Sequence, residues 1–422
     1  MRLISKSVAL AGLAIVAATP AGAQDKPIAI RGGTVVPVSG PAIPNGTVVI
    51  RGGKIVAVGA NVPVPAGAEI VDARGKYVLP GLVDAMSNIG IAATDQDEPA
   101  EPINPANRAF EAYNPFGDFG SGRGGPLRNR EILSGGVTTM YVGPADATLI
   151  GGQGVVVKTA GPDLAGVVVR EPAAMDMTLG TPPKAAARAR NRDPATRMAE
   201  VAMLRQRLVR AQEYQKTREQ NPNGPRDLGL EALGRLLRRE FPARIQANHP
   251  TDIRSALRLA QEFGFDLVVD GGQGALEFKD ELATRRIPVI LGQVSHPYVS
   301  NEEIPNKEDY PPMDERLPAN LTRAGVKTAI ATFSRSFGSL APAGSAKWLL
   351  IDAGIASGYG LSEADVLKAV TLIPAEILGV ANRVGSLEVG KDADVIVLDG
   401  PPLSVKTWVQ RVYVGGELVF QK

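Results

Sequence analysis

Short runs of apolar, often β-branched residues separated by turn residues fill both ends of the chain, and they predict strands. Toward the N-terminus the runs cover 28–31, 34–37, 47–51 and 54–58. Three dipeptides divide them, and we expect each to form a hairpin turn: Gly32-Gly33, Asn45-Gly46 and Gly52-Gly53. Toward the C-terminus similar runs lie at 394–398, 409–414 and 417–420. Two β-rich ends around a long middle predict one small β-sandwich built from residues 24–80 and 375–422.

The middle of the chain alternates between strand-like and helix-like patterns. Strand patterns lie at 137–142, 154–158, 243–246, 266–270, 287–291 and 327–331. Helix patterns, with apolar residues every three or four positions, lie near 196–219, 228–239, 276–285, 345–357 and 362–370, and one more opens at Thr251-Asp252. This alternation predicts an α/β fold, a parallel TIM-like (β/α)8 barrel over residues 81–374.

Two segments interrupt this alternation. Residues 89–130 are rich in proline and glycine and predict a long loop on the face of the barrel where active sites lie. Residues 184–218 carry ten Lys or Arg against three Asp or Glu. Such a stretch either binds anions or nucleic acid, or forms a solvated helix face. We favour the helix face, since no set of aromatic residues interleaves with the basic ones.

Composition excludes several classes of protein. The 422 residues are 44% hydrophobic and 21% charged with a net charge of +2, so no strong attraction to nucleic acid or anionic membranes is expected. The length predicts one large domain with an accessory one. Without cysteine, the chain has neither disulfides nor thiolate metal sites.

The first residues are typical of a secretory signal peptide. Arg2 and Lys6 precede an apolar run at 8–18, which is short for a membrane span, and Ala21-Gly22-Ala23 fits a cleavage site. We therefore expect a signal peptide over 1–23, cleavage near Ala23, and a periplasmic or secreted protein that does not contact the membrane afterwards. An uncleaved anchor is the alternative.

Several longer motifs carry a resemblance to a known family. They are Gly75-Lys-Tyr-Val-Leu-Pro-Gly-Leu-Val-Asp84, Gly135-Gly-Val-Thr-Thr139, the run 150–158, and the C-terminal runs 370–379 and 385–398. Together they resemble the amidohydrolase superfamily, in its imidazolonepropionase-like branch. The resemblance implies hydrolysis of C–N bonds other than peptide bonds, or of related lactam and lactone bonds, by a water that one or two divalent metals activate. It also implies metal ligands at strand ends, beginning with His-x-His on the first strand.

The ligand positions that the resemblance implies hold other residues in this chain. The first-strand pair is Met86 and Asn88, the fifth strand has Gln246, the sixth has Gln273 or, in another register, Asp270, and the eighth has Phe333. Lys158 alone remains as a candidate for the carboxylated lysine of the fourth strand. Thioether, carboxamide and phenyl groups are poor Zn²⁺ ligands, so we expect no metal cofactor.

The two histidines do not repair this set. His249 lies three residues beyond Gln246, an odd offset that points to the opposite face of the strand. His296 follows the seventh strand and is a candidate general base or ligand contact, or else a hydrogen-bonded loop residue. Asp84 is expected to orient or cap its neighbours, and turn formation accounts for Asp392 and Asp394.

Three functions remain open. The favoured one is a non-catalytic amidohydrolase homologue that binds a small molecule in the barrel mouth or assembles with itself or with an active homologue. The alternative is an active hydrolase with a rearranged or metal-poor site, for which the weak catalytic candidates are Lys158, Asp270 and His296. The third is a basic interaction module built on residues 184–218.

Overall fold

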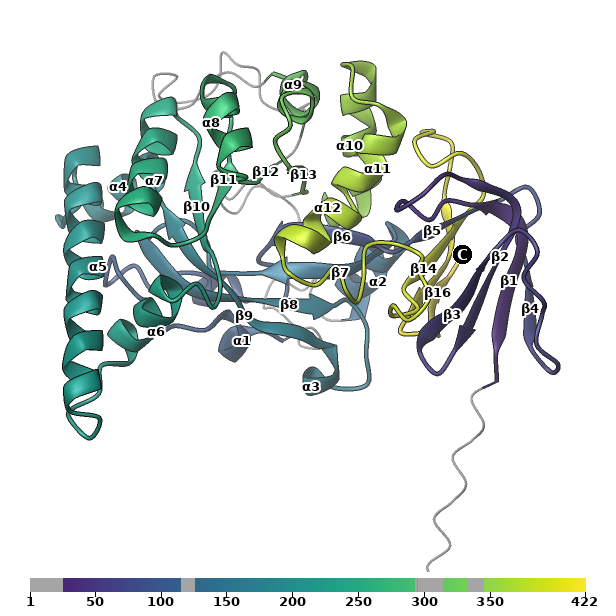
Figure 1. Cartoon of the computed structure of the whole chain (residues 1–422), viewed down its shortest axis with the longest axis horizontal. Coiled ribbons are helices and arrows are strands. Elements are labelled where there is room, and N and C mark those ends of the chain that lie inside the picture. Colours follow the sequence, from purple (N-terminus) through teal and green to yellow (C-terminus); the bar gives the residue numbers. More distant parts are fainter. Residues whose placement is uncertain (1–25, 115–125, 293, 295–313, 333–344) are drawn as a thin grey trace, which may run out of the picture.

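The computed structural model describes residues 26–114, 126–292, 294, 314–332 and 345–422, and it contains two eight-stranded sheets. The expected segment 1–23 and the residues His296 and Phe333 lie outside the described part. Figure 1 shows one sheet at the core of a helix-covered body and the other sheet beside it. Within the described residues no helix has the length and apolar character needed to cross a membrane.

The first sheet, called here the terminal sheet, joins both ends of the chain. Its order is β16-β15-β14-β5-β1-β2-β3, with β4 beside β1. The strands are β1 (Ile28–Val35), β2 (Ile43–Arg51), β3 (Lys54–Gly59), β4 (Glu69–Asp72), β5 (Tyr77–Pro80), β14 (Val395–Leu398), β15 (Val409–Val414) and β16 (Glu417–Gln421). Antiparallel pairing of β14 with β5 joins the two ends. The expected association of the β-rich ends is confirmed, as one mixed sheet.

Two of the three expected hairpin turns are wrong. Gly32-Gly33 lies inside β1, and Asn45-Gly46 lies inside β2, with Gly33 opposite Gly46 between two register shifts. A Cβ on Gly46 would lie 2.7 Å from Cγ2 of Val35, so glycine is needed there for close approach of the strands. Only Gly52-Gly53 forms the expected turn, between Arg51 of β2 and Lys54 of β3.

The second sheet is the barrel. Its order is β13-β12-β11-β10-β9-β8-β7-β6. The strands are β6 (Leu82–Ser87), β7 (Val137–Val142), β8 (Ile150–Lys158), β9 (Val168–Thr178), β10 (Ala243–Ala247), β11 (Leu267–Gly271), β12 (Val289–Leu291) and β13 (Thr328–Ile330). The edge strands β6 and β13 approach each other without pairing among the described residues, so the barrel is nearly closed. The predicted α/β barrel fold is confirmed.

One barrel strand runs against the others. β8 is antiparallel to both β7 and β9, whereas the remaining neighbours are parallel. Only residues 143–149 connect β7 to β8. A parallel crossover needs about a dozen residues, so this connection returns the chain in the opposite direction. The expectation of an all-parallel barrel is therefore wrong at this strand.

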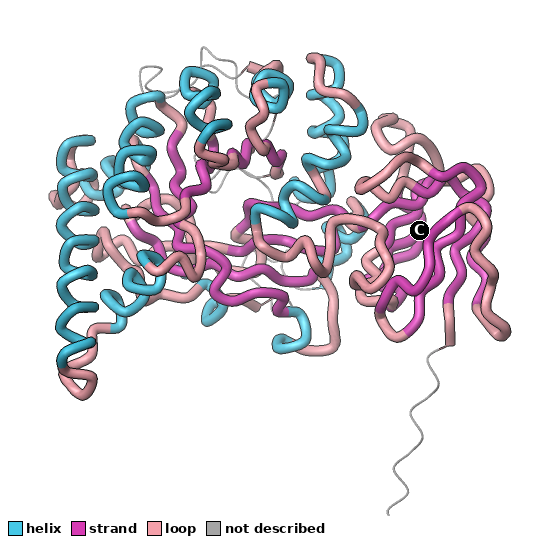
Figure 2. Tube along the Cα trace, viewed as in Figure 1, coloured by secondary structure: helices cyan, strands magenta, loops and turns pink. Residues whose placement is uncertain are grey.

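Helices cover the outer side of the barrel strands (Figure 2). The longer ones are α2 (Pro126–Ser134), α4 (Thr181–Arg188), α5 (Arg197–Gln220), α6 (Leu228–Leu237), α7 (Pro250–Phe263), α9 (Leu317–Arg323), α10 (Leu349–Gly358) and α11 (Glu363–Ala369). The shorter ones are η1 (Ala93–Asp95), α1 (Ala109–Ala112), α3 (Leu164–Val167), η2 (Ala275–Phe278), α8 (Lys279–Thr284), η4 (Ser345–Trp348) and α12 (Leu372–Ile377). Leu204 and Leu208 of α5 pack with Ile245 of β10 in the largest core cluster. A separate cluster fills the barrel interior and includes Met86 and Tyr141.

Candidate functional site in the barrel

Strand register decides which residues share the interior of the barrel. On β10, Ala243, Ile245 and Ala247 join the outer core, so Arg244 and Gln246 face inward. Gln246 is opposite Asp270 on β11. Of the two candidates for the sixth-strand position, Asp270 lies on the strand and faces the barrel interior beside Gln246. Gln273 follows three residues later, beyond the end of the strand.

The first-strand positions serve packing and loop contacts. Met86 is 1% exposed and packs in the interior cluster with Ala85 and Tyr141. Asn88 follows β6, and its amide donates to Oε1 of Gln96 at 2.8 Å. Neither side chain is a strong donor to a divalent metal.

A buried ion pair lies inside the barrel between β10 and β11. Nε of Arg244 donates to Oδ2 of Asp270 at 3.0 Å, and Nη2 donates to Oδ1 at 2.9 Å and Oδ2 at 2.7 Å. The side chains are 1% and 0% exposed. The Arg244 guanidinium also stacks over the Tyr141 ring, 3.8 Å from its centroid, and the Tyr141 hydroxyl donates to Asp176 at 2.6 Å. The carboxylate of Asp270 is thus already paired with a positively charged side chain of the protein itself, that of Arg244.

This arginine was not among the predicted site residues. The signal was present, because residues i and i+2 of a strand share a face, and Gln246 was already placed on the inner one. An inward arginine in a barrel core requires a carboxylate partner, and two neighbouring strands carry one, Asp176 on β9 and Asp270 on β11.

Asp84 joins the first and last barrel strands where the sheet does not close. Its carboxylate accepts hydrogen bonds from the backbone N–H groups of Met86 and Thr332, both at 3.3 Å, and from the Thr332 hydroxyl. Burial raises the pKa of Asp84 to about 6, although the bonds from Thr332 and Met86 and the charge of Arg244 act in the opposite direction. Asp84 therefore orients its neighbours, and burial favours the protonated form of its carboxyl group.

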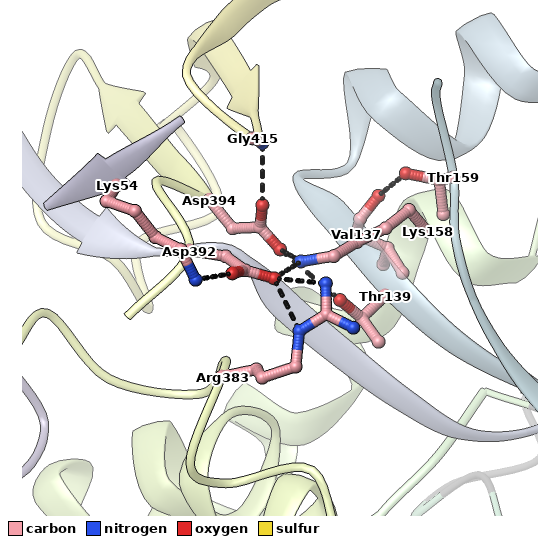
Figure 3. A network of polar contacts seen from close by, with 9 residues as sticks. All are labelled: Lys54, Val137, Thr139, Lys158, Thr159, Arg383, Asp392, Asp394 and Gly415. Atoms are coloured by element: carbon pink, nitrogen blue, oxygen red, sulfur yellow. Dashed lines mark hydrogen bonds and ion pairs between the residues drawn. The ribbon is translucent and has the colours of Figure 1, made fainter. Parts of the chain in front are cut away.

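Lys158 does not join these residues. It ends β8 opposite Thr139, near the start of β7, so the reversed direction of β8 carries it to the other end of the barrel. There its ammonium group contacts Asp394 and lies 3.0 Å from Oδ2 of Asp392 (Figure 3). β8 is also the third strand of the barrel, so Lys158 does not lie on the fourth strand, where the carboxylated lysine was expected.

The aspartates around Lys158 are more than turn formers. Asp392 also pairs with Lys54 at 2.7 Å and with Arg383 at 2.9 Å, and Asp394 accepts from the Gly415 N–H at 2.9 Å (Figure 3). Burial opposes ionisation of Asp392, but Lys158, Lys54 and Arg383 together lower its pKa to about 2. This cluster, called here the lysine clamp, binds the barrel to the segment that enters the terminal sheet.

His249 caps a helix. Its Nδ1 accepts a hydrogen bond from the Thr251 N–H at 3.1 Å, at the N-terminus of α7. A helix-capping ring nitrogen satisfies one of the free N–H groups of the first turn. The geometry gives His249 a structural role outside the barrel interior.

The residues at the ligand positions do not fit a divalent metal. The described residues contain no cluster of three or more His, Cys, Asp or Glu side chains suited to hold one. At the positions themselves stand a thioether, two carboxamides and Asp270, whose oxygens accept three hydrogen bonds from Arg244. A Zn²⁺ site is built from imidazole, carboxylate or thiolate ligands, and Asp270, which is paired with Arg244, is the one side chain of these classes in the set.

The basic stretch 184–218 takes part in helix packing. Two of its arginines pair with acidic residues of α7: Arg197 with Asp252 at 2.6 Å and Arg205 with Glu262 at 2.7 Å. Leu204 and Leu208 of the same helix are buried beside these pairs. These contacts favour the helix-face interpretation.

Comparisons with known proteins agree with this architecture. Residues 306–419 match the model of the "Amidohydrolase family". The structure superposes on an amidohydrolase from Thermotoga maritima with a TM-score of 0.83 and 32% identity, covering 94% of this chain and all of that one. Amidohydrolase tasK of Hapsidospora irregularis is 25% identical over 393 residues, and an imidazolonepropionase of Bdellovibrio bacteriovorus is 28% identical over 178.

A nearly closed barrel beside a mixed sheet from both chain ends is the amidohydrolase fold. The chain belongs to the amidohydrolase family of hydrolases. It spans 38% of the length of each of these two curated relatives, although it covers the Thermotoga protein completely.

Proposed function

We propose that this chain is an exported, imidazolonepropionase-like member of the family that has no hydrolytic metal centre and acts without catalysis. It binds a small molecule in the barrel or serves as the partner subunit of an active homologue. The observation that carries this proposal is the bidentate ion pair of Asp270 with buried Arg244, at a position where the family resemblance implies a metal ligand.

Several contacts support the loss of the metal centre. Met86 is engaged in apolar packing and Asn88 in a bond to Gln96. Gln246 donates to Asp146 at 3.2 Å. Each of these groups is a weak metal donor, and together they leave no set of three ligands at these positions.

The buried arginine also indicates what kind of ligand the barrel holds. Nη1 of Arg244 is buried and has no hydrogen-bond partner among the described residues. A buried donor without a partner costs about 1–3 kcal/mol, so a ligand that satisfies it gains affinity. We propose a small molecule with a carbonyl or carboxylate oxygen, held on Nη1.

Export and domain organisation remain proposals that rest on the sequence. They comprise the signal peptide 1–23, the barrel 81–374 and the composite domain of 24–80 and 375–422. The paired arginines of α5 give no support to a nucleic-acid partner.

The test is an activity and binding screen on the mature protein, residues 24–422. Amides, lactams and lactones are offered with and without added Zn²⁺ or Mn²⁺. We expect no turnover under either condition. We also expect a compound with an acceptor oxygen to raise the melting temperature of the protein, and the variant Arg244→Gln to lose this stabilisation. Copurification with a homologue that retains His-x-His supports the partner-subunit form, whereas metal-dependent turnover contradicts both forms.

One contact favours the alternative of an active hydrolase with a rearranged site. The Thr332 hydroxyl donates to buried Asp84, the arrangement of a nucleophile beside a base. The earlier candidates Lys158 and Asp270 are both held in ion pairs. If the screen finds turnover that survives metal removal, Thr332→Val and Asp84→Asn each abolish it on this alternative.

A further inference from the structure

The guanidinium of Arg244 occupies the space between the strands that carry the ligand positions. It binds Asp270 on β11, stacks on Tyr141 of β7, and exerts its charge on Asp84 of β6. Asp270 is opposite Gln246, and Asp84 lies two residues before Met86. A fixed positive charge therefore lies against Asp270, the carboxylate opposite Gln246, and within electrostatic reach of Asp84.

A guanidinium opposes a metal more firmly than other cationic side chains do. Lysine, histidine and cysteine release protons when a metal binds, whereas arginine stays charged at any ordinary pH. The pair is almost fully buried, so solvent screens the repulsion between Arg244 and a divalent ion only weakly. Arg244 also holds the one carboxylate that stands at a ligand position.

We propose that Arg244 takes the place of the metal cation in this barrel and actively excludes divalent metals. Replacing the missing ligands is then insufficient to restore a metal site while Arg244 remains. This inference rests on the proposed absence of a metal centre. It adds a physical reason for that absence, which is the positive charge of Arg244.

The experiment restores two ligands with Arg244 present or absent. The variant N88H/Q246H, with Asp270, offers two imidazoles and one carboxylate, a set that suits a three-ligand Zn²⁺ site. It is compared with N88H/Q246H/R244Q, where the charge is removed and an amide can still donate to Asp270. N88H/Q246H/R244K is the intermediate case, because lysine carries the charge but can release its proton when a metal binds. Zn²⁺ affinity is measured by competition with a chromogenic chelator, and the Co²⁺ absorption spectrum reports coordination independently of activity.

We expect Zn²⁺ to bind the R244Q variant at least about 100-fold more tightly than N88H/Q246H, because burial strengthens the repulsion from Arg244. The R244K variant should bind Zn²⁺ with an affinity between these two. Equal affinity with Arg244 and with glutamine at this position overturns the inference. If the R244Q variant does not fold, N88H/Q246H/R244L/D270H replaces it, since that combination leaves no unpaired buried charge and supplies a third imidazole. Folding is checked by circular dichroism.

The unmodified protein separates this inference from the proposed function. Stoichiometric Zn²⁺ in the unmodified chain refutes the absence of a metal centre itself. A metal-free unmodified chain together with tight Zn²⁺ binding in N88H/Q246H upholds that absence and refutes only the role of Arg244.

Discussion

At the residue scale, the barrel interior is governed by a few buried charges with fixed partners. Arg244 and Asp270 neutralise each other, and Asp84 is held by Thr332. An unpaired charge at such depth would cost several kcal/mol, so these contacts are requirements of the fold as well as features of the site.

Asp84 should make stability fall as the pH rises from about 4 to 6. Its pKa in the folded chain is about 6, against an ordinary value of 3.8, so the folded state binds the proton more tightly than the unfolded state. Asp84 makes its full contribution to the free energy of unfolding below pH 3.8, and this contribution is lost as the pH rises through 6. It amounts to about 3 kcal/mol, because each pKa unit corresponds to about 1.4 kcal/mol. Urea unfolding across this range should show a slope that Asp84→Asn reduces, while buried Glu200, whose pKa is raised to about 8, still contributes. The exposed substitution Asp280→Asn is the control, and an unchanged slope in Asp84→Asn refutes the assignment.

At the element scale, the apolar patterns predicted most of the strands. They did not predict β9, and they did not indicate the direction of β8. β9 was missed because Glu171, Pro172 and Asp176 interrupt its apolar run, although a strand pairs on each side of it. The direction of β8 is absent from its sequence, because an apolar run reads alike in parallel and antiparallel sheets. The connection to β7 is short because β8 begins at Ile150, before the predicted run 154–158, so the sequence pattern did not indicate the reversal.

The lysine clamp should stabilise the protein through Lys158 far more than through Lys54. Lys158 is 7% exposed and its removal leaves Asp392 and Asp394 with one buried partner fewer, whereas Lys54 is 48% exposed. We expect Lys158→Met to lower the free energy of unfolding by about 3–5 kcal/mol. Lys54→Met, which removes another partner of Asp392, should cost less than about 1 kcal/mol. Chemical denaturation measures both, and similar losses would show that burial does not set the strength of the clamp.

Gly46 tests the bulged pairing of β1 and β2. Gly46→Ala places a methyl group 2.7 Å from Cγ2 of Val35, and overpacking of this kind costs about 1–3 kcal/mol. Gly40→Ala is the control, since no atom lies within 4 Å of the added Cβ. Gly46→Ala should lower the melting temperature and Gly40→Ala should not. An unchanged melting temperature for Gly46→Ala would favour a hairpin turn at this position.

At the scale of the whole molecule, the family motifs and the site residues carry different information. The motif ending in Asp84 and the C-terminal runs specify a barrel joined to a terminal sheet, and that fold could be predicted from them. The site could be predicted only as a set of replacements at Met86, Asn88 and Gln246. The ion pair that we propose in place of a metal depends on Arg244 and Asp270 meeting across neighbouring strands, which requires the register of β10 against β11.

The most direct test of the account is the metal content of the mature chain, produced in zinc-supplemented medium and dialysed against metal-free buffer. Mass spectrometry of the metals should find well below one Zn²⁺ per chain, because the ligand positions hold weak donors and a carboxylate bound to Arg244. One or two tightly held ions per chain, with hydrolysis that disappears on chelation, would contradict it.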